Sequence, residues 1–106
     1  MESVGKALPE KRVMTSILHL NLHSEFFAQI AAGTKRIEYR QRTAYWKARL
    51  EGRHYDTIQF RNGYATDAPE MKVEFLGVRR IQKWGEPHYA IRLGRILKIK
   101  RWEYAS

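Results

Sequence analysis

The sequence contains no cysteine and no long apolar run. The lack of cysteine excludes disulfides and thiolate metal sites, and it fits a reducing compartment, so we expect a cytoplasmic protein. A membrane-spanning helix needs about 20 consecutive apolar residues, and no stretch approaches that length. The N-terminal residues also lack the apolar segment of a secretory signal. We therefore expect no membrane partner.

Acidic residues are few relative to basic ones, with 11 Asp and Glu against 20 Lys and Arg and a formal net charge of +9. The chain has 106 residues, 43% of them apolar and 29% charged, which indicates one globular domain with a modest core. An excess of positive charge on a small domain favours polyanionic partners, with nucleic acid first among them. The alternative is a basic surface without a specific partner.

Residues 1–14 show no clear periodicity, and we expect a flexible leader before a single domain at residues 15–106. Beyond the leader, alternation of apolar and polar residues predicts short strands. They lie at about 17–22, 35–41, 55–60, 71–81, 88–93 and 96–99. Within the fourth run, Gly77 predicts a bulge or a tight bend. Gly94 is expected to interrupt the extended run and so to separate the last two strands.

Short helices are expected between the first three strands. The first begins with Ser24 as its N-cap and ends at Gly33, which tolerates a positive φ without steric cost. The second follows Thr43 as its N-cap and stops at Gly52. We therefore predict an α+β fold: a small β-barrel of five or six mostly antiparallel strands with two or three short helices.

The stretch GTKRIEYR contains the densest group of reactive side chains. Side chains alternate along a strand, so Ile37 and Tyr39 should share one face and Glu38 and Arg40 the other. A lysine beside a carboxylate can transfer protons, which makes Lys35 and Glu38 the catalytic candidates if the protein is an enzyme. An arginine can hold a phosphate through two hydrogen bonds. The alternative is a ladder of ion pairs on a solvated strand face.

Cations and aromatic residues recur in the helix and loops after this stretch. Cations fix phosphates and aromatic rings stack on bases, so the pattern predicts binding of RNA, single-stranded nucleic acid or a nucleotide. The expected binding residues are Lys35, Glu38, Arg40, Arg42, Tyr45, Arg61, Asn62, Tyr64 and Trp84. The alternative places the aromatic rings in the core and the cations in solvent. The four histidines lack metal-ligand spacing, and no nucleotide-cofactor motif is present, so no metal or other cofactor is expected.

The motif Gly33-x-Lys35-x-x-Glu38-x-Arg40, placed after a strand and a short helix, resembles the ASCH domains (activating signal cointegrator homology) of the PUA-like superfamily. The resemblance covers about residues 17–96. It implies a small β-barrel with a cleft beside the motif strand and a role in binding RNA or nucleotides. It also implies that Lys35, Glu38 and Arg40 are residues of that cleft.

Some members of the resembled family are hydrolases, either ribonucleases or enzymes that deacylate N4-acetylcytidine. The deacylases use a lysine, a threonine three residues later and a separate glutamate. Lys35 matches that lysine, but Glu38 occupies the threonine's position, so the hydroxyl nucleophile is missing from the motif. A hydrolase acting on RNA or on a modified nucleoside is thus the alternative to a binding module. A protein-interaction module with a basic face is a weaker alternative.

Overall fold

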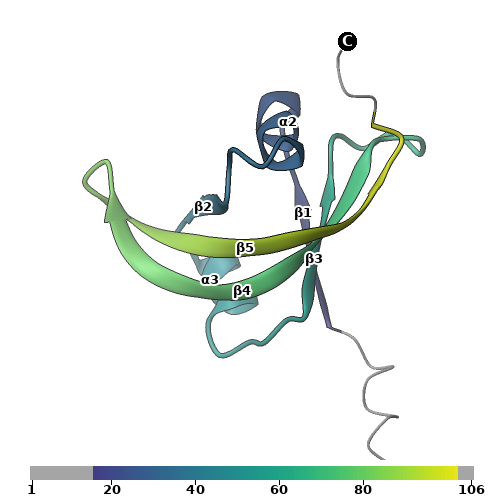
Figure 1. Ribbon diagram of the computed structural model, residues 1–106. Helices are drawn as coiled ribbons and strands as arrows, with labels where there is room; N and C mark the ends of the chain where they lie inside the picture. The colour runs from purple at the N-terminus through teal and green to yellow at the C-terminus, as the bar shows by residue number, and fades with distance from the viewer. Residues whose placement is uncertain (1–15, 103–106) are drawn as a thin grey trace, which may run out of the picture.

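The computed structural model describes residues 16–102, which form an α+β fold with two helices and one five-stranded mixed sheet (Figure 1). The predicted leader lies outside the described residues. In chain order the elements are β1 (Ile17–Asn21), α2 (Ser24–Ala31), β2 (Ile37–Gln41), α3 (Ala44–Leu50), β3 (Thr57–Arg61), β4 (Glu70–Lys83) and β5 (Glu86–Lys100). No helix within residues 16–102 has the length and apolar character needed to cross a bilayer.

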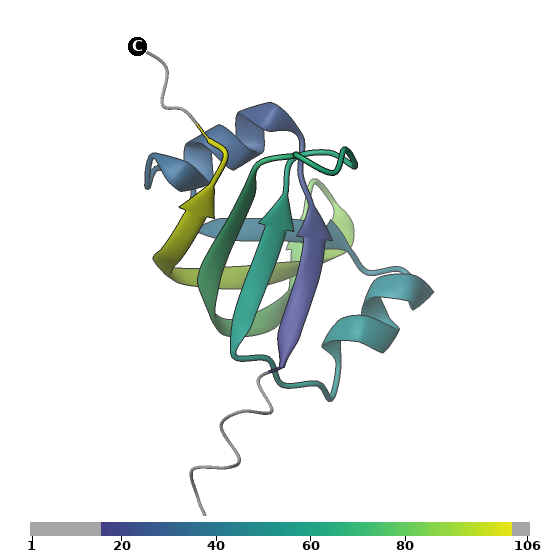
Figure 2. The ribbon, with the colours of Figure 1, turned by 90° about the vertical axis from the view of Figure 1, so that its right-hand side faces the viewer.

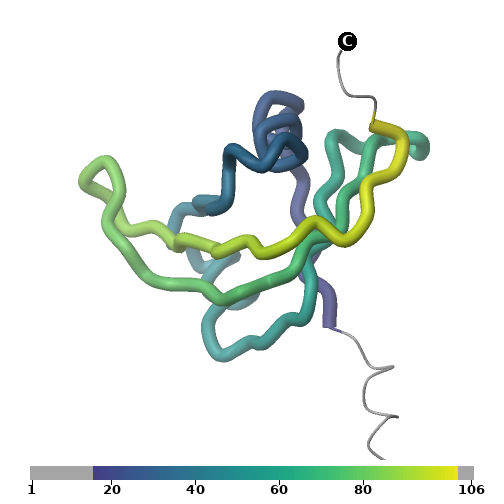
Figure 3. Tube along the Cα trace, in the orientation of Figure 1, coloured from purple at the N-terminus to yellow at the C-terminus, as the bar shows by residue number. Residues whose placement is uncertain are grey.

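The sheet is organised around the long, bent hairpin of β4 and β5 (Figure 1 and Figure 3). The first half of β4 pairs with β3, while the first half of β5, up to Arg92, pairs with β2. Figure 2 shows β1, β3 and parts of β4 and β5 side by side, with the rest of the hairpin crossing behind them. The β4–β5 register shifts near Gly77, which has a φ of 131°, a conformation that glycine adopts readily. The predicted bulge at Gly77 is confirmed.

The strand order β1-β3-β4-β5-β2 leaves β1 and β2 at the two edges of the sheet. The α+β class and the mostly antiparallel pairing are confirmed, since only β1 and β3 run parallel. A closed barrel is not shown, because no pairing joins β1 to β2 in the part of the chain that the structure describes.

The prediction that Gly94 interrupts a strand is wrong, because β5 continues through it without a break. Gly94 instead provides space for a neighbouring side chain. A Cβ atom at this position would lie 2.6 Å from Oε1 and 2.8 Å from Cβ of Glu74 on β4. The role of Gly94 is therefore to allow two paired strands to approach closely, and not to form a turn.

The helix ends follow local chemistry, with one shift. Thr43 is the N-cap of α3, and its hydroxyl accepts a hydrogen bond from the Trp46 amide at 3.2 Å, as predicted. Gly33 follows α2 with a φ of 83°, also as predicted. The N-cap of α2, however, is His23 and not Ser24. The Ser24 hydroxyl instead donates to Oδ1 of Asn62, at 3.2 Å, so it ties the helix to the loop after β3.

The core lies on one face of β1, β3, β4 and β5, where α2 and α3 contribute apolar side chains. It includes Leu18, Leu20, Leu22, Phe27, Ile30, Leu50, Ile58, Phe60, Met71, Val73, Tyr89, Ile91 and Leu93. Because side chains alternate along a strand, the residues between these buried positions point to the other face. In β1 and β3 those residues are polar, and they form part of the candidate site.

Candidate functional site

A buried ionic centre lies on β2. Glu38 is 6% exposed, and its Oε1 lies 3.4 Å from Nζ of Lys35. The other carboxylate oxygen, Oε2, accepts a hydrogen bond from Nε of Arg40 at 2.9 Å. Arg40 also donates from Nη2 to the carbonyl oxygen of Asn21, at 3.0 Å. A carboxylate at this depth needs such compensation, so the three charged side chains form one unit and not a solvated ladder.

The first cleft opens beside this ionic centre, with a volume of about 370 Å³. It is lined by Phe26, Lys35, Glu38, Tyr39, Arg40, Gln41, Thr43, Trp46, Trp84 and His88. Nζ of Lys35 lies 5.3 Å from the ring centroid of Phe26 and 5.5 Å from that of Tyr39. The charged residues of the motif therefore meet aromatic walls in one concave space.

The second cleft has a volume of about 430 Å³ and lies next to the first, over the outward face of β1 and β3. It is lined by His19, Leu20, Asn21, Arg40, Tyr45, Trp46, Gln59, Arg61 and Tyr64. Arg40 and Trp46 belong to both clefts. The guanidinium carbon of Arg40 lies 4.9 Å from the Trp46 ring centroid, so a stacked cation and indole join the two spaces.

Two exposed aromatic rings lie at the clefts. Trp84 is 79% exposed in the turn between β4 and β5, and Tyr64 is 89% exposed in the loop after β3. Nζ of Lys83 lies 4.3 Å from the Trp84 ring centroid and 4.1 Å from that of Tyr39. Large rings in this position leave a face free to stack against a ligand.

A separate polar contact holds α3 in place. Tyr89 is buried on β5, and Glu51 directly follows the last residue of α3. The Tyr89 hydroxyl donates a hydrogen bond to Oε2 of Glu51 at 2.6 Å. This hydrogen bond, together with the positive charge of Arg80, holds the pKa of Glu51 below its ordinary value. Burial and the same contact raise the pKa of Tyr89. The pair fixes the end of the helix that carries Trp46 into the clefts.

The structure brings most of the predicted binding residues to the two clefts. Lys35, Glu38, Arg40 and Trp84 line the first, and Arg40, Tyr45, Arg61 and Tyr64 line the second. Arg42 and Asn62 line neither. Arg42 donates to the carbonyl oxygen of Ile81 at 3.0 Å and lies over the ring of Tyr89, so it joins β2 to the hairpin. Asn62 accepts a hydrogen bond from the Ser24 hydroxyl through its Oδ1.

Sequence reasoning missed His19, Asn21 and Gln59 as lining residues of the second cleft. The alternation along β1 places His19 and Asn21 opposite the buried leucines, so their outward direction was available from the sequence. Their neighbours were not. The parallel pairing of β1 with β3 sets His19 against Gln59 and Asn21 against Arg61, and no local pattern specifies that register.

The described residues contain no group of three or more His, Asp or Glu side chains placed to hold a metal ion. Comparisons of the chain with protein-family models, with curated proteins and with solved structures found no match. The geometry and chemistry of the two clefts are therefore the basis for assigning a function.

Proposed function

We propose that this protein binds RNA or a nucleotide through the two joined clefts. The observation that carries the proposal is the convergence of Lys35 and Arg40 on a buried Glu38 within an aromatic-walled cleft. Cations on a concave surface attract phosphates, and aromatic rings accept bases by stacking. The net charge of +9 adds long-range attraction for any polyanion.

In this proposal the charged residues have two roles. Lys35 and Arg40 contact a phosphate or a base edge, since both retain N–H donors beyond those used on Glu38. Glu38 holds both cations in position, and it can accept a hydrogen bond from a base amino group. Trp84 stacks a base at the mouth of the first cleft, and Tyr64 does so at the second.

The resemblance to ASCH domains supports the same function, because it assigns the three motif residues to a nucleotide- or RNA-binding cleft. Membership of that family, and of the PUA-like barrels, is part of the proposal. So is a cytoplasmic location, where RNA and nucleotides are abundant. A bent sheet with a charged cleft beside β2 is the geometry that such an assignment requires.

The test is a binding titration with labelled single-stranded RNA and with nucleotides at several salt concentrations. We expect Lys35→Ala and Arg40→Ala each to weaken binding about tenfold or more, since a hydrogen bond to a charged group contributes about 1.5–3 kcal/mol. Arg53→Ala, which removes an exposed cation outside both clefts, is the control. Unchanged affinity in both cleft variants would refute the site.

The same samples test for hydrolysis. Thr43 supplies a hydroxyl to the first cleft, but that oxygen already caps α3 through the Trp46 amide. A binding module leaves RNA and N4-acetylcytidine intact over long incubation. Product that forms with the wild-type protein and not with Glu38→Gln would instead identify a hydrolase in which Lys35 and Glu38 share proton transfer.

A further inference from the structure

The outward face of the sheet remains basic beyond the second cleft. Gln59 of β3 pairs with Lys72 of β4, and Lys72 pairs with Lys98 of β5. A small hollow of about 110 Å³ lies there, lined by Gln59, Glu70, Lys72, Lys98 and Lys100. Gln59 lines both this hollow and the second cleft, so the two are adjacent on the sheet.

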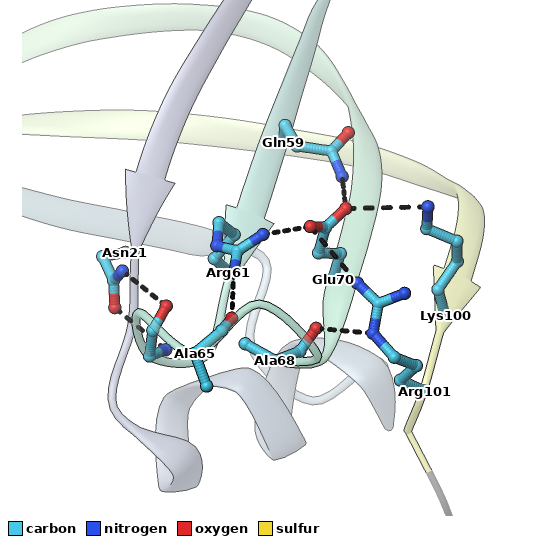
Figure 4. A network of polar contacts seen from close by, with 9 residues as sticks. Asn21, Gln59, Arg61, Ala65, Ala68, Glu70, Lys100 and Arg101 are labelled. Atoms are coloured by element: carbon cyan, nitrogen blue, oxygen red, sulfur yellow. Dashed lines mark hydrogen bonds and ion pairs between the residues drawn. The ribbon is translucent and has the colours of Figure 1, made fainter.

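Glu70 is the only carboxylate that lines the hollow, and it is shared among several cations (Figure 4). It accepts hydrogen bonds from Arg61 and from Gln59, and it lies within 3.4 Å of Nη2 of Arg101 and 3.9 Å of Nζ of Lys100. No ion pair within residues 16–102 joins Lys72 or Lys98 to an acid. Positive charge is therefore in clear excess over β3, β4 and β5.

The Lys72–Lys98 pair is unfavourable for folding by itself. Like charges directly opposite each other on neighbouring strands destabilise a sheet. The arrangement becomes favourable when an anion lies across both side chains. The hollow is too small to enclose a nucleoside, so it fits a phosphate of an extended chain better than a separate small ligand.

We infer that the ligand is a single-stranded polynucleotide, which places a base in the clefts and extends its phosphates across β3, β4 and β5 onto Lys72 and Lys98. This inference rests on the proposed function, and it adds the class of ligand and the path. The crossing from β3 to β5 covers two interstrand gaps, about 10 Å, which a strand of a few nucleotides can span.

The experiment compares a mononucleotide with RNA and DNA strands of about four and about ten nucleotides, by fluorescence anisotropy. We expect affinity to rise about tenfold or more from the mononucleotide to the longer strands, with the RNA and DNA arms showing whether the path distinguishes the two sugars. The double variant Lys72→Gln/Lys98→Gln should lose this rise and keep the mononucleotide affinity. Its salt slope should fall by about 1.4, or about 0.7 for each lost phosphate contact.

The control variant Lys47→Gln/Arg53→Gln removes the same charge from exposed positions outside the hollow. The Lys72→Gln/Lys98→Gln variant should melt no lower than wild type, since it removes a like-charge pair. Equal affinity for short and long ligands would overturn the inference, and so would equal losses of affinity in the two double variants. In either case, mononucleotide binding that depends on Lys35 would still support the proposed function. Absence of binding to any ligand would overturn both. Binding of the wild-type protein to an acidic protein, but to none of the nucleic acid ligands, would also reject a polynucleotide as the ligand.

Discussion

Replacement of Arg40 by lysine tests the joined clefts most directly, because it keeps the charge and removes the geometry. In the wild-type protein the guanidinium donates to Glu38 at 2.9 Å and to the Asn21 carbonyl at 3.0 Å, and it stacks on Trp46 at 4.9 Å. A lysine ammonium is a point donor on a flexible stem, so it can serve one of these acceptors but cannot reproduce the planar fork or the stacking.

The expected loss of stability and of affinity in Arg40→Lys follows from these contacts. A hydrogen bond to a charged group contributes about 1.5–3 kcal/mol, and the lost stacking adds about 0.5–1 kcal/mol. Part of this is recovered, because Arg40 is 19% exposed and water can reach the abandoned acceptors. We expect Arg40→Lys to lower the free energy of unfolding by about 1–2 kcal/mol, which shifts Tm by about 4–8 °C for each kcal/mol. We expect affinity for single-stranded RNA to fall about tenfold.

The assay pairs thermal unfolding with a binding titration, and Arg49→Lys is the matched control. Arg49 also stacks on an aromatic ring, with its guanidinium carbon 4.4 Å from the Tyr45 centroid, but its side chain is exposed and has no carboxylate partner among the described residues. Arg49→Lys loses only the stacking, so it should lower the free energy of unfolding by about 0.5 kcal/mol, less than Arg40→Lys, and leave the affinity nearly unchanged because Arg49 lines neither cleft. If Arg40→Lys behaves in the same way as this control, Arg40 does not join the clefts as described.

Two further predictions concern the scaffold. Tyr89→Phe removes the hydrogen bond to Glu51 and should lower the free energy of unfolding by about 1 kcal/mol at neutral pH. The folded-state pKa of Glu51 is lowered and that of Tyr89 is raised. The difference in free energy of unfolding between wild type and variant should therefore shrink as pH falls below 4.5 and as pH rises above 10.0. Urea titrations that show the same difference at every pH would contradict this. Gly94→Ala places a methyl group against Glu74 and should cost about 1–3 kcal/mol in the same titrations, so a fully stable variant would show that the strands can separate without loss.

Much of the local structure was predictable because its causes are local. The Thr43 cap, the positive φ at Gly33 and the bulge at Gly77 each follow from the chemistry of one residue and its neighbours.

Two local predictions were wrong. The N-cap of α2 is His23 and not Ser24, and Gly94 does not end a strand, although a glycine in an extended run is typical of a break. The role of Gly94 depends on Glu74 of the neighbouring strand, which the local sequence does not place.

The sequence by itself determined the charge, the order of the elements and the position of Glu38 and Arg40 on one side of a strand, because these depend on composition and on alternation along the chain. Only the tertiary structure decided that Glu38 is buried and that β1 lies parallel to β3. It also set Lys72 against Lys98, which extends the basic face away from the clefts. These features arise from pairing between distant segments, whose register is selected by the packing of the whole core and not by any one stretch of residues.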